Sequence, residues 1–165
     1  MIKIFGLGNI LLCDDGIGVR VLESLREKLN QLGKDIELII GETDYKYCIE
    51  QVKDDDFIII IDSTNFMIKP GKVSKITFEE CDKFLFIDNQ SYIDNNDEIF
   101  LKKLRTEKKY VKGYLLGIEV DEVKHSAQLS KKIKFMYNKI CDNIYEDKAS
   151  VINERNTIRG YKIRI

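Results

Sequence analysis

Apolar residues recur along the first part of this chain with two alternating periods, one typical of strands and one typical of amphipathic helices. Short β-branched runs bounded by glycine or aspartate favour strands. Valine and leucine repeated every three or four residues, up to a stop at Gly33, favour a helix. The pattern predicts strands at 2–6, 36–40 and 57–61, a helix at 16–32, and a helix at 44–53 entered through Thr43.

The rest of the chain is patterned less regularly. A loop at 63–69 and a Pro70-Gly71 turn are followed by a mixture of short segments. From Ser130 an apolar stripe at helical spacing predicts a last helix that packs on the core. Other elements are predicted as strands at 73–78 and 83–87, a short helix at 97–105 and a strong strand within 110–120.

The order of these elements predicts an α/β fold. The run at 57–61 is apolar throughout, which is typical of a strand buried on both faces of a parallel sheet. Strands that alternate with helices form right-handed crossover units with helices on both sides. We therefore expect a three-layer α/β/α sandwich whose central sheet is mixed, mostly parallel and of about five strands.

Length and composition agree with one folded domain. The chain has 165 residues and is 44% hydrophobic. We expect the α/β domain to occupy 1–145 and a C-terminal extension to occupy 146–165. Within that extension, apolar and basic residues alternate at 161–165, which indicates an edge strand or a partner-facing tail.

Charge and hydropathy narrow the classes of partner. The chain carries 27 Lys and Arg against 28 Asp and Glu, a net charge of -1, so no global field attracts nucleic acid or anionic lipid. No apolar run approaches the ~18 residues of a membrane span, and a strand follows Met1 without a charged leader. We expect a cytoplasmic monomer that neither inserts into a membrane nor binds nucleic acid.

The four cysteines do not form a zinc-binding pattern. No Cys-x-x-Cys pair occurs, and the chain has a single histidine, His125. We expect four free thiols that pack as small hydrophobic side chains. Cys13 is next to two carboxylates, which oppose thiolate formation and disfavour a role as nucleophile.

The candidate chemistry lies where two of the predicted strands end. Asp14 and Asp15 follow the first strand through a Gly6-Leu7-Gly8 turn, and Asp62 ends the third strand. Because ligands of open parallel sheets bind beyond the carboxyl ends of neighbouring strands, we expect Asp15 and Asp62 to converge in one crevice. Such a pair either ligates a metal or works as general acid and base.

Simpler roles remain open for the same residues. Asp14 or Asp15 could be the N-cap of the first helix, and Asp62 could anchor a turn. The two initial glycines resemble a dinucleotide fingerprint, but Leu11 stands where the third glycine belongs. A nucleotide-binding module is therefore the least favoured hypothesis.

The N-terminal segment resembles the signature of the hydrogenase maturation endopeptidases, which trim the C-terminus of the large subunit of [NiFe] hydrogenases after nickel insertion. The resemblance extends from Met1 to about Ile144, and its first motif is the most specific. The residues that carry it are the run from Gly6 to Arg20, Gly41-Glu42-Thr43, Ile61-Asp62, Pro70-Gly71-Lys72-Val73, Gly117-Ile118-Glu119-Val120 and Leu129-Ser130.

This resemblance implies a set of site residues. Asp15 and Asp62 correspond to two of the family's three nickel-contacting side chains and would be the catalytic pair. The third is a histidine whose position corresponds to 87–91, where this chain has none. Asn89 is our expected third metal contact, with Asp88 and His125 as alternatives, although imidazole is the better donor for nickel.

Two functions follow from the resemblance. The first is an aspartic-type, nickel-dependent endopeptidase that removes the C-terminal extension of a hydrogenase large-subunit precursor, with the nickel carried by that precursor. The alternative is a non-catalytic relative of the same fold that binds nickel or the precursor without cutting. The chain has no Ser-His-Asp set that would support a different peptidase mechanism.

Overall fold

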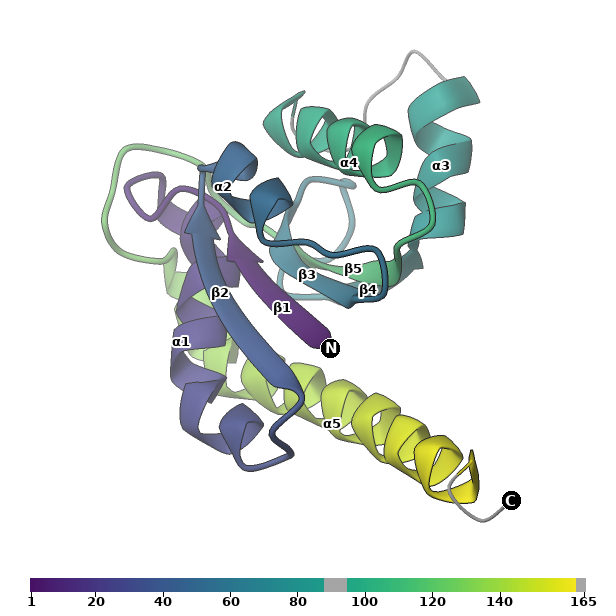
Figure 1. The fold of residues 1–165 in the computed structure, drawn as a ribbon. Coiled ribbons are helices and arrows are strands. Elements are labelled where there is room, and N and C mark those ends of the chain that lie inside the picture. The colour runs from purple at the N-terminus through teal and green to yellow at the C-terminus, as the bar shows by residue number, and fades with distance from the viewer. Residues whose placement is uncertain (88–94, 163–165) are drawn as a thin grey trace.

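The computed structural model describes residues 1–87 and 95–162 and shows one mixed sheet of five strands (Figure 1). The strands lie in the order β2-β1-β3-β5-β4, so β1 and β3 are hydrogen-bonded neighbours. The pairs β1–β2, β1–β3 and β3–β5 are parallel, and β4 is antiparallel at the edge. The strands are β1 (Ile2–Leu7), β2 (Ile36–Glu42), β3 (Phe57–Thr64), β4 (Val73–Thr77) and β5 (Lys112–Glu119).

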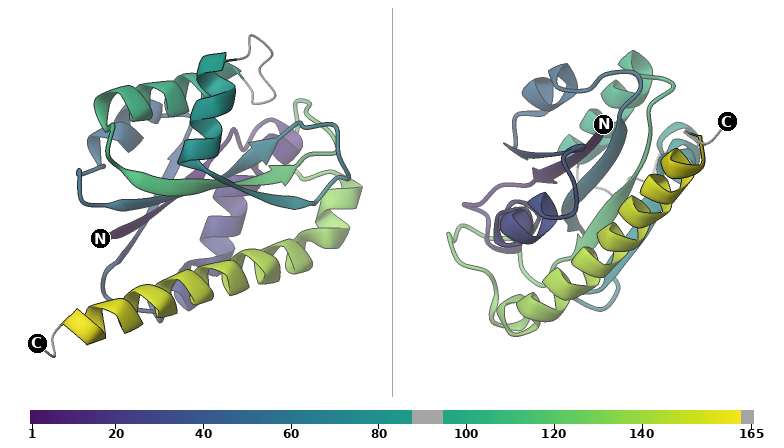
Figure 2. Two further views of the ribbon diagram at one scale, coloured as in Figure 1. Left: turned by 90° about the vertical axis from the view of Figure 1, so that its right-hand side faces the viewer. Right: turned by 60° about the horizontal axis from the view of Figure 1, so that its bottom comes forward.

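Helices cover both faces of this sheet, which confirms the predicted sandwich (Figure 2). One face is covered by α1 and α5, and the opposite face by α2, α3 and α4. A short 3-10 helix, η1 (Cys13–Gly16), comes directly before α1. The α-helices are α1 (Ile17–Asn30), α2 (Tyr45–Glu50), α3 (Phe78–Ile87), α4 (Asn95–Glu107) and α5 (Lys131–Lys162).

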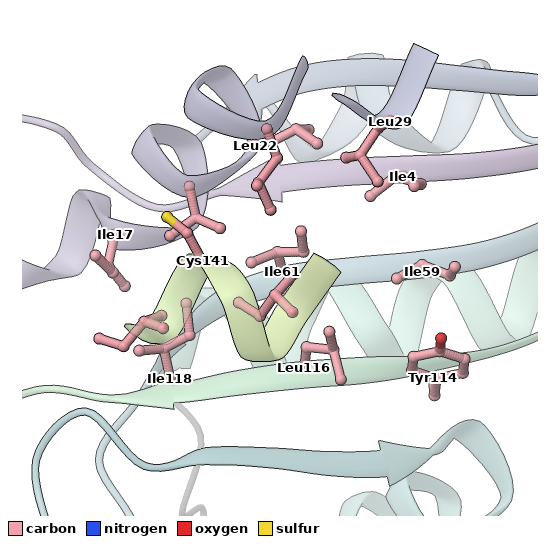
Figure 3. Packing of buried hydrophobic residues seen from close by; sticks show 14 of the residues in the cluster. Ile4, Ile17, Leu22, Leu29, Ile59, Ile61, Tyr114, Leu116, Ile118 and Cys141 are labelled. Carbon is pink, nitrogen blue, oxygen red and sulfur yellow. The ribbon is translucent and has the colours of Figure 1, made fainter. Parts of the chain in front are cut away.

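The central strand β3 divides the core into two layers because its side chains alternate between the faces of the sheet. Ile59 and Ile61 pack with α1 and α5, as Figure 3 shows, whereas Ile58 and Ile60 pack beneath α2, α3 and α4. All four isoleucines are at most 1% exposed. The apolar run thus forms a strand buried on both faces, as predicted.

A glycine sets the distance between α1 and the sheet. A Cβ atom at Gly18 would lie 2.2 Å from the carbonyl oxygen of Ile61 and 2.6 Å from that of Leu7. No side chain fits there, so the first turn of α1 rests directly on the ends of β1 and β3. This contact places η1, immediately before α1, at the carboxyl ends of both strands.

One predicted strand is a helix. The segment 83–87 belongs to α3, which begins with a capping box: the Glu80 amide donates to Thr77 Oγ1, and the Thr77 amide donates to Glu80 Oε2. The cap starts the helix, and Phe78 and Cys81 bury one side of it. A short apolar run alone could not distinguish the two structures.

Two further differences concern helix ends. Helix α2 is shorter than predicted and is capped by Asp44, whose side chain accepts from the Tyr47 amide, rather than by Thr43. Helix α5 continues through Lys162, so the expectation of an edge strand is wrong for residues 161 and 162. The structure therefore continues the last helix into the segment expected to be a separate extension.

Candidate active site

Asp15 is placed at the carboxyl end of the sheet by the loop that leaves β1. This loop starts at Gly8, whose φ of 109° lies in a region that favours glycine. The Asn9 amide donates to Asp15 Oδ2 at 2.8 Å, so the loop folds back on the carboxylate. Asp15 is partly exposed within η1.

Ser63 connects the two predicted catalytic residues. Its hydroxyl donates to Asp15 Oδ1 at 3.0 Å, and its backbone amide donates to Asp62 Oδ1 at 2.8 Å. Asp62 is the more buried of the two aspartates, at 2% exposed. Asp15 is thus held at the end of β3, the strand that carries Asp62, by the next residue Ser63, while the catalytic roles of both aspartates stay a prediction.

Gly8 lies between the same two aspartates. A Cβ atom at this position would lie 1.9 Å from the carbonyl oxygen of Asp15 and 3.5 Å from Asp62 Oδ1. Any side chain would push η1 away from β3. The glycine that follows β1 thus allows the close approach on which the site depends.

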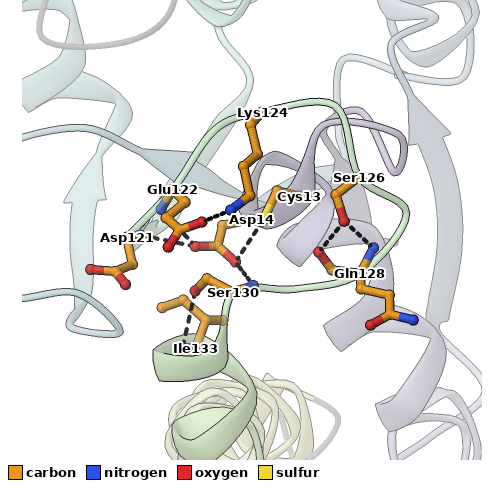
Figure 4. A network of polar contacts seen from close by, with 9 residues as sticks. All are labelled: Cys13, Asp14, Asp121, Glu122, Lys124, Ser126, Gln128, Ser130 and Ile133. Carbon is orange, nitrogen blue, oxygen red and sulfur yellow. Dashed lines mark hydrogen bonds and ion pairs between the residues drawn. The ribbon is translucent and has the colours of Figure 1, made fainter.

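Asp14 has a different role from its neighbour Asp15 (Figure 4). It is fully buried, and its carboxylate accepts backbone N–H bonds from Ser130 at 2.7 Å, Glu122 at 2.9 Å and Asp121 at 3.0 Å. All three donors lie between β5 and α5. Asp14 therefore fastens η1 to this connection and to the start of α5.

Neither aspartate is the N-cap of α1. That position is Gly16, which forms no side-chain capping bond. Ser130 caps α5 instead, because its hydroxyl accepts from the Ile133 amide at 3.3 Å. The carboxylate of Asp14 accepts a hydrogen bond from the Ser130 amide at the N-terminus of α5. The dipole of α5 also favours a negative charge at this position.

All four thiols are free and buried, as predicted. Burial, together with the charge of Asp14, raises the pKa of the Cys13 thiol above its ordinary value. Burial, together with Asp44 and Asp62, raises the pKa of Cys48 to about 12, and the pKa of Cys81 is also raised to about 12. These thiols remain protonated at neutral pH, which disfavours a cysteine nucleophile.

Two of the three candidates for a further metal contact cannot be placed. Asn89 and Asp88 lie outside the described residues, so the third contact stays a prediction. His125 is exposed in the connection between β5 and α5, where its neighbour Ser126 pairs with Leu12. Within 1–87 and 95–162, no group of three or more His, Cys, Asp or Glu residues is arranged to hold a metal ion.

Three residues near the site were not expected from the sequence. Asn9 and Ser63 donate to the carboxylates. Glu119, at the end of β5, is 1% exposed and accepts hydrogen bonds from the segment that follows β3. The sequence signals that could have identified them are a polar residue after a predicted parallel strand for Ser63 and the Gly117-Ile118-Glu119-Val120 motif for Glu119.

None of the helices in the described part of the chain combines the length and apolar character that a bilayer crossing requires.

A family model described as hydrogenase maturation protease matches residues 19–147. Among curated proteins, the hydrogenase expression/formation protein HupD of Thiocapsa roseopersicina is 29% identical over 84 residues, which are 51% of this chain and 38% of that protein. The putative hydrogenase maturation protease of Methanocaldococcus jannaschii is 37% identical over 81 residues, or 48% of this chain and 51% of that protein. The matched segment thus spans about two fifths to one half of these relatives.

Solved structures match over most of the chain. The [NiFe] hydrogenase maturation protease HybD from Thermococcus kodakarensis is 26% identical with a TM-score of 0.69, covering 90% of this chain and 98% of that one. The hydrogenase maturating endopeptidase HybD from E. coli shares the fold with a TM-score of 0.69 at 20% identity, covering 87% of this chain and 88% of that one.

Proposed function

Because the chain belongs to the hydrogenase maturation protease family, we propose that it is an endopeptidase that removes the C-terminal extension of a [NiFe] hydrogenase large-subunit precursor after nickel insertion. The observation that carries this proposal is the position of Asp15 at the carboxyl end of β3, where the Ser63 hydroxyl donates to it and Gly8 approaches both Asp15 and Asp62. A hydrolase of this fold needs reacting groups at that edge, and these are the two carboxylates predicted to act there.

The pair suits contact with a metal that the substrate supplies. Both aspartates offer oxygen donors, whereas nickel in a resident protein site favours imidazole or thiolate. Two carboxylates can recognise a nickel ion already held by the precursor without retaining it. We propose Asn89 as the third contact, since the resemblance makes the family's histidine correspond to positions 87–91.

The proposed reaction is the hydrolysis of one peptide bond. Water attacks the carbonyl carbon, a C–O bond forms, and the C–N bond breaks. One carboxylate of the pair accepts a proton from the attacking water, and the leaving amine takes up a proton. The Asn9 amide and the Ser63 hydroxyl each donate to Asp15, which holds its carboxylate in a fixed orientation during these steps.

The test is cleavage of a purified large-subunit precursor, nickel-loaded or nickel-free. We expect a shortened product only from the nickel-loaded precursor, and its loss in Asp15→Asn and Asp62→Asn. Asp142→Asn is the matched control, because this exposed aspartate lies on α5, away from the pair. Cleavage that survives in the double variant of Asp15 and Asp62 would refute the roles proposed here.

The absence of a histidine from 87–91 favours one alternative, a relative that binds the precursor without cutting it. Stable binding of the nickel-loaded precursor with no shortened product would support that function instead. The same incubation therefore separates the two hypotheses.

A further inference from the structure

The segment that follows β3 presents an exposed apolar side chain on an unfavourable backbone. This segment, residues 65–69, is called the β3–β4 loop below. Met67 at its centre is 91% exposed, and its φ is 59°. The left-handed region is unfavourable for a residue other than glycine. Neither the conformation nor the exposure favours folding, and a strained residue beside a candidate site suggests a functional role.

A buried carboxylate holds this conformation in place. Glu119 accepts hydrogen bonds from the amide of Phe66 at 2.9 Å and from the amide of Ile68 at 3.1 Å, the two residues that flank Met67. It also accepts from Thr64 Oγ1 at 3.3 Å. Because Glu119 ends β5, the loop is fastened to the central sheet and is not free to turn Met67 inward.

The loop lies beside the candidate site. Asp62 and Thr64 belong to the same strand that enters the loop, and this strand ends at the edge of the sheet where η1 lies (Figure 2). Exposed Asn65 and Lys69 border the apolar centre of the loop. An apolar centre with a polar rim is the usual composition of a protein contact surface.

We propose that Met67 contacts an apolar segment of the polypeptide substrate beside the cleaved bond, and that Glu119 is the positioning residue that keeps Met67 in place. A side chain held rigidly before binding loses little conformational entropy on contact. Methionine adapts well to irregular apolar surfaces. The inference rests on the proposed function, because that function makes a polypeptide the ligand of this edge.

The test compares variants in two assays with the nickel-loaded precursor, equilibrium binding and steady-state cleavage. Met67→Gly removes the side chain and suits the left-handed backbone, so the fold is expected to persist. We expect a Kd and KM about 10- to 100-fold higher, with kcat changed less than about threefold. Glu119→Gln should also raise KM, because the glutamine side chain cannot accept all three hydrogen bonds from Thr64, Phe66 and Ile68.

Two variants serve as controls. Met67→Leu restores an apolar side chain and should bind the precursor within about threefold of the wild type. Phe135→Ala removes a side chain that is also 91% exposed but lies on α5, and it should leave both assays unchanged. Unchanged binding and KM in Met67→Gly would overturn the inference even if the wild type cleaves the precursor.

If the chain is not an endopeptidase, the same two assays give a different result. If the wild type binds the precursor without cutting it, weaker binding by Met67→Gly still supports the contact, and only the endopeptidase activity is refuted. If the wild type neither binds nor cleaves, both proposals fail. If the Met67→Gly variant and the wild type differ in oligomeric state in solution, Met67 contacts another copy of the chain, and the inference is overturned.

Discussion

Mutation of Asp14 is expected to reduce stability, whereas mutation of its neighbour Asp15 in η1 is expected to abolish activity. Asp14 is fully buried, and three backbone amides donate to its carboxylate. A hydrogen bond to a charged group contributes about 1.5–3 kcal/mol. Part of the energy of the three lost hydrogen bonds is recovered if the loop relaxes so that water reaches its amides. Asp14→Ala should therefore lower the free energy of unfolding by about 3–6 kcal/mol. Asp15 is partly exposed and accepts two hydrogen bonds, so Asp15→Ala should cost about 1 kcal/mol.

Urea unfolding followed by circular dichroism measures the two stability changes, and cleavage of the nickel-loaded precursor at low temperature measures activity of the folded fraction. Asp14→Ala should be unstable yet retain cleavage per folded molecule, whereas Asp15→Ala should be stable and inactive. If Asp14→Ala does not fold, Asp14→Asn provides the measurement, because it retains one acceptor for the Ser130 amide. Equal stability losses at the two positions would refute the division of roles.

Three further predictions concern packing and protonation. Gly18→Ala should destabilise the fold by more than about 3 kcal/mol in urea unfolding, because its Cβ would meet two strand carbonyls. Burial lowers the pKa of Lys148 from 10.5 to about 7, so the unfolded chain binds more protons between these values. Stability should therefore rise by up to about 1 kcal/mol per pH unit from pH 7 to 8.5, and Lys148→Met should lose most of this slope. The raised thiol pKa values predict that a thiol reagent at pH 8 labels Cys48 and Cys81 only after unfolding, whereas fast labelling of the native protein would contradict their burial.

Periodicity was sufficient to predict the elements whose burial is regular. Helix α1 has one apolar stripe and β3 is apolar on both faces, so their types followed from spacing. The segment 83–87 was predicted wrongly because four successive apolar residues fit a strand or a helix. The decisive signal was upstream, in Thr77 and Glu80, where the capping box begins α3.

The candidate site was predictable only where the topology determines it. Because β1 and β3 are parallel neighbours, the loop that carries Asp15 lies at the end of the strand that carries Asp62, and the order of elements along the chain indicates that neighbourhood. The role of Asp14 was not predictable, because its partners lie more than 100 positions away and belong to a loop without pattern. The sequence also could not show which of the two adjacent aspartates points its side chain into the protein interior.

The bridging position of Ser63 has a consequence for redesign of this protein. This residue orients the Asp15 carboxylate through its hydroxyl and the Asp62 carboxylate through its backbone amide, so only the first contact depends on the serine side chain. Replacing the serine by alanine would remove one of the two hydrogen bonds that hold Asp15, while the backbone bond to Asp62 would remain. A redesign of this pair must therefore vary positions 15 and 63 together.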